Sequence, residues 1–350
     1  MERLSEKEWK PVSLGEVYNN YHGKRLTKEK RISGTTPLLT AGESNNGVAE
    51  FISNANMPQY SKFVSIDMFG NSFFHPYRAT GDDNIYFFEN LHLTAETKEF
   101  TCVSIEKQSC KFSYGKQFRQ RNADSLKTML PVTDSGEPDY AYMAEYVQQK
   151  RDTMLAKYRA YVEARIAELG ELVEIPVFDE KEWKHFRMPE IFGLIQRGKR
   201  LKNADHVPGI VPYVSSTANN NGVDDYIEAT PGTRAFGDCI SLANSGSVGT
   251  AFYEPFEYVA SDHVTALKTE GMSKYVYLFL IATIEKQGSN FNFNREINDA
   301  RIKNMQIMLP VDDAGEPDYA YMEQYSKNMM LRKYKQYLEF INRQNVTEVD

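Results

Sequence analysis

Cysteine is scarce in this 350-residue sequence, which has only three: Cys102, Cys110 and Cys239. They form no C-x-x-C pair and have no histidine at metal-ligand spacing, so neither a disulfide framework nor a zinc site is indicated. Long apolar runs are also missing. No stretch approaches the ~20 consecutive apolar residues that a membrane span needs, and the opening MERLSEKEWK lacks the apolar core of a signal peptide. We therefore expect a cytoplasmic protein without membrane contact, whose thiols are reduced and buried.

Catalytic motifs are missing as well. The sequence has no GxxxxGK(S/T) phosphate loop, no GxSxG or HExxH motif, and no Pro-Pro dipeptide such as amino-methyltransferases use. The net charge of −7 argues against a protein that holds nucleic acid by overall charge alone. These absences predict a non-catalytic chain with no cofactor and no metal of its own. A solitary methyltransferase or nuclease is the rival, and it predicts turnover by the isolated chain.

What the sequence does contain is a repeat of itself. LPVTDSGEPDYAYM begins at Leu130 and LPVDDAGEPDYAYM at Leu309, with twelve of fourteen positions identical. Upstream, KEWK at Lys7 recurs at Lys181, and GKRL at Gly23 recurs at Gly198. The spacing is about half the chain, far longer than the ~20–45 residues of a solenoid repeat. The sequence therefore predicts a duplicated domain with an approximate two-fold axis.

Each repeat changes character partway through. Its first part has short β-rich runs broken by Gly, Asn and Pro, which is typical of a compact, strand-dominated mixed domain. From Asp139 to Leu169 there is no Gly or Pro, and the second repeat behaves alike from Asp318. Apolar residues recur there at helical spacing, with Pro138 just inside the start and Gly170 as the stop. The first stripe is Met143, Val147, Met154, Tyr158, Val162, Ile166 and Leu169, and the second is Met322, Tyr325, Met329, Tyr334, Leu338 and Ile341.

Helices of ~30 residues are about 45 Å long, too long for a small domain to cover. We expect the two to pair with each other as an antiparallel coiled coil; the alternative is that each folds back on its own domain. The predicted fold class is α+β: two tandem strand-rich mixed α/β domains separated by two long antiparallel helices, with pseudo-two-fold symmetry. The predicted boundaries are a first domain at 1–130, a junction and helix at 131–178, a second domain at 179–308, and a junction and helix at 309–350.

Basic residues gather at the same place in both repeats. Asn20–Arg31 holds five basic side chains and one acidic, and Gly193–Lys202 holds four and none. Such clusters suit DNA phosphates, and the Asn-rich and Gly-containing loops that follow suit base edges. The candidate DNA-binding residues are Lys24, Arg25, Lys28, Asn45, Asn46 and Asn71 in the first repeat, and Arg197, Lys199, Arg200, Asn220, Asn221, Ser245 and Ser247 in the second.

Simpler explanations exist for each of these features. Asn and Gly are what tight turns use, and a basic cluster can be an ordinary solvated face. Glu137 and Asp139 resemble a catalytic carboxylate pair, but a turn followed by a helix start explains both better. The occurrence of the basic clusters in both repeats is what favours DNA binding.

Together these residues resemble the specificity (S) subunit of a restriction-modification system, of type I or type IIB. The resemblance covers nearly the whole chain. It rests on the twofold LPV-x-D-x-GEPDY-x-YM junction, the W-x4-LGE opening at Trp9, GKRLTK at Gly23–Lys28, TAGESNNGV at Thr40–Val48, and the pairs Asp82-Asp83 and Asp262-His263. The second repeat departs from it at Phe192-Gly193, so no base can be assigned by analogy.

The resemblance implies that 1–130 and 179–308 are target-recognition domains, each reading one half of a bipartite site in double-stranded DNA. It implies that the helices are a spacer that docks two methyltransferase subunits, with a restriction subunit as a further partner. S-adenosylmethionine is then expected on the methyltransferase and not on this chain. The candidate partner-binding residues are Met143, Val147, Met154, Tyr158, Met322, Tyr325, Met329 and Tyr334, although each could simply fill a helix seam. The rival from another class is a scaffold or decoy that binds methyltransferases without reading DNA.

Overall fold

A computed structural model describes residues 3–288, 291 and 295–347, with side chains described to residue 343. The chain forms two compact units, Met1–Arg159 and Ala160–Asp350, and the boundary falls inside a helix. Within the described residues, no helix combines the length and apolarity that crossing a bilayer requires.

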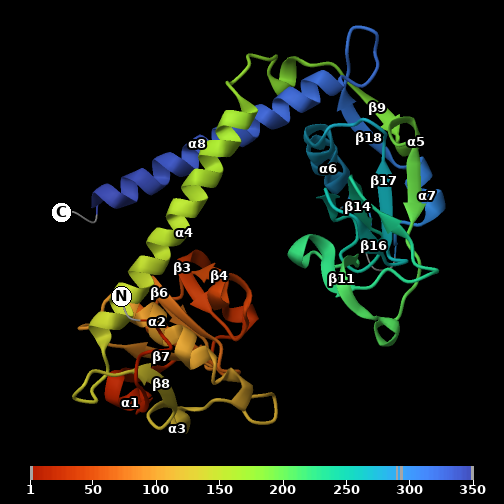
Figure 1. Cartoon of the computed structure of the whole chain (residues 1–350). Helices are drawn as coiled ribbons and strands as arrows, with labels where there is room; N and C mark the ends of the chain where they lie inside the picture. Colours follow the sequence, from red (N-terminus) through yellow and green to blue (C-terminus); the bar gives the residue numbers. More distant parts are fainter. Residues whose placement is uncertain (1–2, 289–290, 292–294, 348–350) are drawn as a thin grey trace. The chain divides into compact units, whose positions relative to one another are not determined.

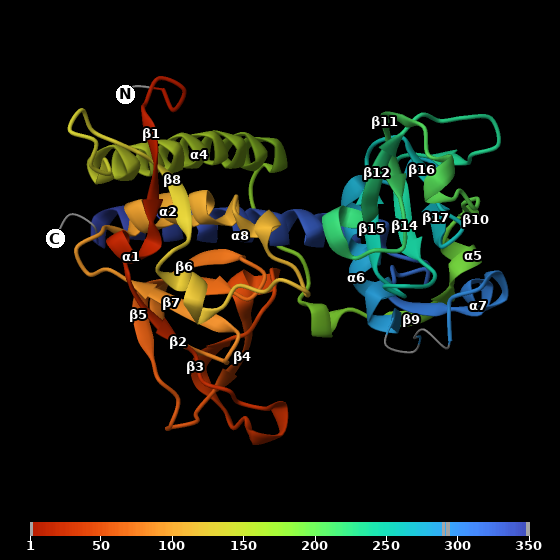
Figure 2. The ribbon, with the colours of Figure 1, turned by 90° about the horizontal axis from the view of Figure 1, so that it is seen from below.

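Unit 1 is built on a six-stranded sheet with the order β2-β7-β5-β6-β3-β4 (Figures 1 and 2). Helix α2 covers one face, where Phe100 and Ile105 pack with Val64, Ile66 and Phe88 of the sheet. The elements are β1 Trp9–Ser13, α1 Leu14–Val17, β2 Asn19–His22, η1 Lys28–Lys30, β3 Ser33–Leu39, η2 Ser44–Gly47, β4 Val48–Ile52, β5 Tyr60–Asp67, β6 Ser72–Gly81, β7 Ile85–Glu89, α2 Ala95–Glu106, η3 Ser109–Lys111, α3 Gln120–Ala123, β8 Lys127–Pro131 and α4 Tyr140–Leu169.

Unit 2 divides its main strands between two four-stranded sheets, β10-β17-β14-β15 and β12-β11-β16-β13. Helix α6 packs on the first sheet, as α2 does in unit 1. The elements are η4 Phe178–Glu180, β9 Trp183–Arg187, α5 Met188–Ile191, β10 Leu194–Arg197, η5 Asn203–Asp205, β11 Pro208–Val214, η6 Asn219–Gly222, β12 Val223–Ile227, β13 Ala235–Phe236, β14 Cys239–Ala243, β15 Ala251–Glu254, β16 Tyr258–Ala260, β17 Val264–Lys268, α6 Lys274–Gly288, α7 Asp299–Asn304, β18 Gln306–Pro310 and α8 Tyr319–Thr347.

The predicted duplication is confirmed by the topology. In both units an antiparallel ladder pairs the first strand with the last, β1 with β8 and β9 with β18. In both, one parallel contact joins equivalent strands, β3 to β6 and β11 to β16. The predicted α+β class with two strand-rich domains is therefore correct, while the four residue boundaries stay a prediction.

The most similar parts of the two repeats meet at this ladder. Lys7 Nζ lies 2.9 Å from Asp139 Oδ2, and Lys181 Nζ lies 2.8 Å from Asp318 Oδ2. The KEWK and GEPDY segments are thus the two sides of one junction that closes each domain. This supports the structural interpretation of Asp139 over a catalytic one.

Both long helices form close to where the sequence predicts them. Asp139 and Asp318 cap them, because their Oδ1 atoms accept the N–H of Tyr142 at 3.0 Å and of Tyr321 at 2.9 Å. Pro138 is not the first helical residue as expected, since it pairs with Val132 before the helix begins.

Gly170 ends α4 as predicted. It has a φ of +78°, and its N–H donates to Ile166 O at 3.0 Å.

The apolar stripe of α4 packs in two different places, one in each unit. Met143, near the start of α4, lies in the core of unit 1. In unit 2, Leu169 at the end of α4 packs with Leu331 of α8. Beyond it, Val173 N–H donates to Asn328 Oδ1 at 3.2 Å, so the chain direction is opposite to that of α8. Both predicted arrangements therefore occur, folding back at the helix start and antiparallel pairing in unit 2.

One expectation about cysteine is wrong. Cys102 and Cys239 are buried free thiols, but Cys110 is exposed. It lies in η3, on a short loop after α2, where no core covers it.

Candidate nucleic-acid interface

A glycine anchors each basic cluster to its domain. Gly23 N–H donates to Ile85 O and Gly198 N–H to Val264 O, both at 2.9 Å. A Cβ at Gly23 would lie 1.9 Å from Asp82 O, and one at Gly198 would lie 2.2 Å from Ser261 O. Only glycine allows this approach, so the basic residues that follow leave each domain from an equivalent point. We call Gly23–Lys28 and Gly198–Lys202 the basic arms.

The arm of unit 1 is open to solvent. Lys24, Arg25 and Lys28 are all exposed. Lys24 Nζ donates to the Asn56 carbonyl at 3.0 Å, while the Arg25 guanidinium is 77% exposed and 3.7 Å from an Asp83 oxygen. Such loosely held cations can move to phosphates at little cost, because surface ion pairs contribute less than ~1 kcal/mol.

The arm of unit 2 presents Lys199 and Arg200, which are exposed. Arg197 does not belong with them. Its Nη2 donates to Ile297 O at 3.1 Å and its Nε lies 3.2 Å from Asp299 Oδ1, so the guanidinium ties β10 to the start of α7. Its assignment as a phosphate contact stays a prediction, and it is the least favoured of the basic residues in this cluster because this guanidinium already bonds inside the domain.

The Asn-rich loops have the same backbone in both units. Asn45 and Asn46 have φ values of 51° and 52°, and Asn220 and Asn221 have 49° and 53°. Asparagine tolerates this left-handed conformation better than most residues. Turn chemistry therefore accounts for the sequence, and the turn leaves all four side chains exposed between paired strands.

The Gly-containing loop of each unit, with Asn71 in unit 1 and Ser245 and Ser247 in unit 2, presents fewer free polar side chains to DNA. Asn71 Nδ2 donates to Asp67 Oδ2 at 2.9 Å, so this amide helps to hold its own loop. Ser245 is 5% exposed, and its hydroxyl bonds with His263 Nδ1 at 2.5 Å, which corrects its placement at the surface. Ser247 is half-buried.

Two exposed aromatic residues were missed from the sequence. Phe51 on β4 is 55% exposed and Tyr226 on β12 is 57% exposed. They occupy the same position in the two repeats, three residues after the NNGV segment, on strands that end their sheets. That shared position next to the Asn turns was the available signal.

The buried titratable groups of the two sheets are structural. His75 Nε2 bonds with Ser65 Oγ at 2.9 Å, and at the equivalent place Ser241 Oγ donates to Glu254 Oε1 at 2.8 Å. Burial lowers the pKa of His75 to about 4 and raises the pKa of Glu254. Among the described residues, no three His, Cys, Asp or Glu side chains gather as a metal site.

The predicted partner-binding residues divide by burial. Met143 and Met322 are fully buried in the two cores, so they cannot contact another subunit as predicted. Met154 is 70% exposed and Tyr158 37% exposed on α4. The others are half-buried: Val147, Tyr325, Met329 and Tyr334.

Residues 6–153 and 180–339 match the type I restriction modification DNA specificity domain, so both repeats are covered. The chain belongs to this family. The specificity subunit S.BcgI of a type II restriction enzyme from Heyndrickxia coagulans is 28% identical over 325 residues, spanning 90% of this chain and 93% of that protein. Among solved structures, the S subunit of a type I restriction-modification system from M. genitalium aligns with a TM-score of 0.52 at 14% identity, covering 99% of this chain and 96% of that one.

Membership of the DNA specificity domain family confirms the resemblance drawn from the repeated junction. The solved S subunit supports the fold, because at 14% identity only the fold can be compared. One relative comes from a type II system and the other from a type I system, so the choice between a type I and a type IIB system stays open.

Proposed function

We propose that the chain is the DNA sequence-specificity subunit of a restriction-modification complex, in which each unit reads one half of a bipartite site. The observation that carries this is the pair of basic arms, anchored by Gly23 and Gly198 at equivalent points. Two such arms would give two phosphate footprints on a chain whose overall charge is negative.

Within each footprint, the exposed cations and the loops have different tasks. Lys24, Arg25, Lys199 and Arg200 neutralise phosphates and fix the register of each unit on the duplex. The exposed asparagines read base edges, where an amide can pair bidentately with adenine. Phe51 and Tyr226 add apolar contact with bases or sugars.

The chemistry belongs to the partners. Methyl transfer requires S-adenosylmethionine, which we place on two methyltransferase subunits, and a base extruded from the duplex. A restriction subunit is a further partner, and the complex acts in the cytoplasm. The chain itself positions these subunits and is not catalytic. Turnover by the isolated chain would contradict this assignment.

Charge reversal tests the reading of DNA. In the complex with its methyltransferase, we expect Lys24→Glu with Arg25→Glu, and Lys199→Glu with Arg200→Glu, each to lower affinity for the bipartite site and to make its salt dependence shallower. The measurement is fluorescence anisotropy over a salt series. Lys127→Glu and Lys303→Glu are the matched controls, because both lysines are exposed outside the arms. Unchanged DNA binding with methyltransferase binding retained would favour the decoy function instead.

A further inference from the structure

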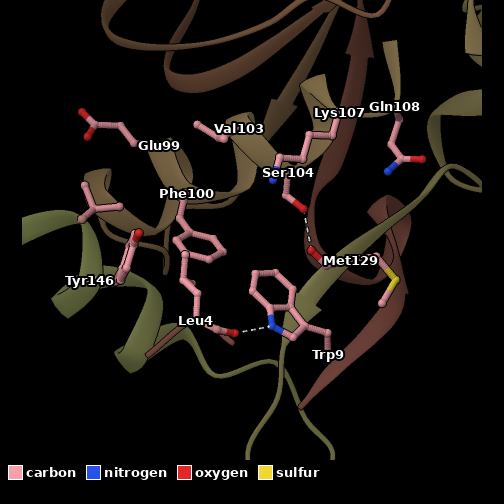
Figure 3. Close-up of a pocket in the computed structure, with 11 residues that line it drawn as sticks. Leu4, Trp9, Glu99, Phe100, Val103, Ser104, Lys107, Gln108, Met129 and Tyr146 are labelled. Carbon is pink, nitrogen blue, oxygen red and sulfur yellow. Dashed lines mark hydrogen bonds between the residues drawn. The ribbon is translucent and has the colours of Figure 1, made fainter. Parts of the chain in front are cut away.

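An apolar groove of about 770 Å³ lies in unit 1 between α2, β1 and the first turns of α4 (Figure 3). Its floor is aromatic. The Trp9 ring stacks on the Phe100 ring, with 6.1 Å between the ring centroids. The Phe100 ring meets Tyr146 edge-on, with 5.8 Å between the centroids. Trp9 Nε1 already donates to Leu4 O at 3.0 Å, so the indole offers only its apolar surface.

Unit 2 has the same groove, of about 340 Å³, between α6 and the first turns of α8. The Trp183 ring stacks on the Phe279 ring, with 6.3 Å between the ring centroids. The Phe279 ring meets Tyr325 edge-on, with 5.6 Å between the centroids. Phe279 corresponds to Phe100 and Tyr325 to Tyr146, because the two pairs are separated by the same number of residues in the sequence. The two grooves are therefore one feature present twice.

The walls of both grooves are open to solvent. Val103 is 58% exposed and Met129 41% exposed in unit 1, and Leu278 is 39% exposed in unit 2. A contiguous apolar surface of this kind is typical of a site that another chain covers. A trough between two helices suits a third helix, which would lay an apolar face into it.

A lysine lines each groove at the equivalent position, Lys107 at the end of α2 and Lys286 in the last turn of α6. Lys286 Nζ lies 6.0 Å from the centroid of the Phe178 ring, which lines the same groove. Each lysine places a positive charge in its groove, which favours an occupant that carries a carboxylate. Three candidate partner-binding residues, Val147, Tyr325 and Met329, also line the grooves. The first turns of each long helix thus form part of a groove.

We propose that each groove docks one amphipathic helix from one methyltransferase subunit, with an acidic side chain of that helix facing Lys107 or Lys286. This rests on the proposed function. Two equivalent grooves call for an occupant present in two copies. A second copy of this chain fits less well, because a chain that offered two grooves to copies of itself would form open-ended assemblies. Each partner would then be held by the recognition domain itself and not by the spacer helices alone.

The test places a charge in each groove of the full chain. Val103→Glu and Ala282→Glu occupy equivalent positions, and both side chains are exposed, so folding should be retained. Leu91→Glu, at a residue that is 83% exposed outside both grooves, is the matched control. Native mass spectrometry with purified methyltransferase subunit counts the bound copies. We expect two for the parent and the control, one for each single variant, and none for the double variant.

Other results have distinct meanings. Two copies bound to both single variants would overturn the groove assignment and leave the proposed function standing. Self-association of the parent chain that the variants abolish would make the occupant a second copy. Failure of the parent to bind any methyltransferase would overturn the proposed partnership, and the groove assignment with it. Circular dichroism melting, together with DNA binding by each variant alone, separates these losses from misfolding.

Discussion

Asp139 and Asp318 each have two structural roles in the repeated junction. Each caps a long helix and pairs with a lysine from the opening of its own repeat. Burial raises the pKa of each carboxyl, but the bonds from Lys7 or Lys181 and from the helix N–H outweigh it, so the pKa lies below the ordinary value of 3.8. Because the folded-state pKa is depressed, this stabilisation is fully present above the unfolded-state value and is lost as pH falls through the folded-state value.

We expect Asp139→Ala to lower the free energy of unfolding by about 1–3 kcal/mol at pH 7, since it removes a cap and a half-buried ion pair. Urea denaturation checks this. The difference from the parent should begin to shrink below about pH 4, where the unfolded-state carboxyl becomes protonated, and should go on shrinking as pH falls through the lower folded-state pKa. Asp134→Ala, at an exposed residue of the turn that precedes Asp139, is the control and should change little. Equal losses from the two variants would mean that the junction does not depend on the pair.

For Glu254 we expect stability to depend on pH in the opposite direction. Burial raises the pKa of this carboxyl above its ordinary value of 4.5, so the unfolded chain releases the proton first and stability falls as pH rises above that value. Glu254→Gln keeps an acceptor for the Ser241 hydroxyl and cannot ionise. We therefore expect the variant to be more stable than the parent at pH 8 and close to it at pH 5, by chemical denaturation. A variant that is less stable at both would show that the buried carboxyl is needed as such.

At the scale of elements, the basic arms depend on glycine. Gly198→Ala would place a methyl group 2.2 Å from Ser261 O, so the arm must move away from β16. We expect a loss of about 1–3 kcal/mol in stability and weaker binding of DNA through unit 2, measured by denaturation and by anisotropy. Gly193→Ala is the matched control, because a Cβ there meets nothing within 4 Å. Unaltered affinity despite lost stability would remove the arm from the interface.

The elements also show where sequence reasoning succeeds. Both long helices were predictable, because uninterrupted apolar spacing is a local signal, and for α4 the glycine at its end is a second one. The inward use of Arg197 was not, since its partner Asp299 lies about a hundred residues later and only the fold brings them together. Ser245 is buried for the same reason, since it bonds with His263 of the turn between β16 and β17. The secondary structure of a segment could be predicted from its sequence, but which of its side chains are exposed to solvent could not.

At the scale of the whole molecule, α4 joins the two units. Arg151 pairs with Glu96 and Glu99 of unit 1, and Tyr161 meets Tyr334 of α8 in unit 2. Residues 152–158 lie between these attachments, and Met154 among them is 70% exposed. If the helix sets the distance between half-sites, deleting this segment shortens the helix while it keeps Arg151 and Tyr161.

Deleting residues 152–158 removes about two helical turns, or ~10 Å, and changes the helix phase by only ~20°. At ~3.4 Å per base pair, the preferred gap between half-sites should shorten by about three base pairs, with neither half-site changed. Because three base pairs turn the duplex by ~0.3 of a turn, affinity should also fall at every gap. Binding selection on a library of gap lengths, using the complex with methyltransferase, measures both effects. Replacing the same seven residues with alanine keeps the length and should keep the gap. An unshifted optimum for the folded deletion variant would mean that the spacing is set by the partner subunits and not by this helix.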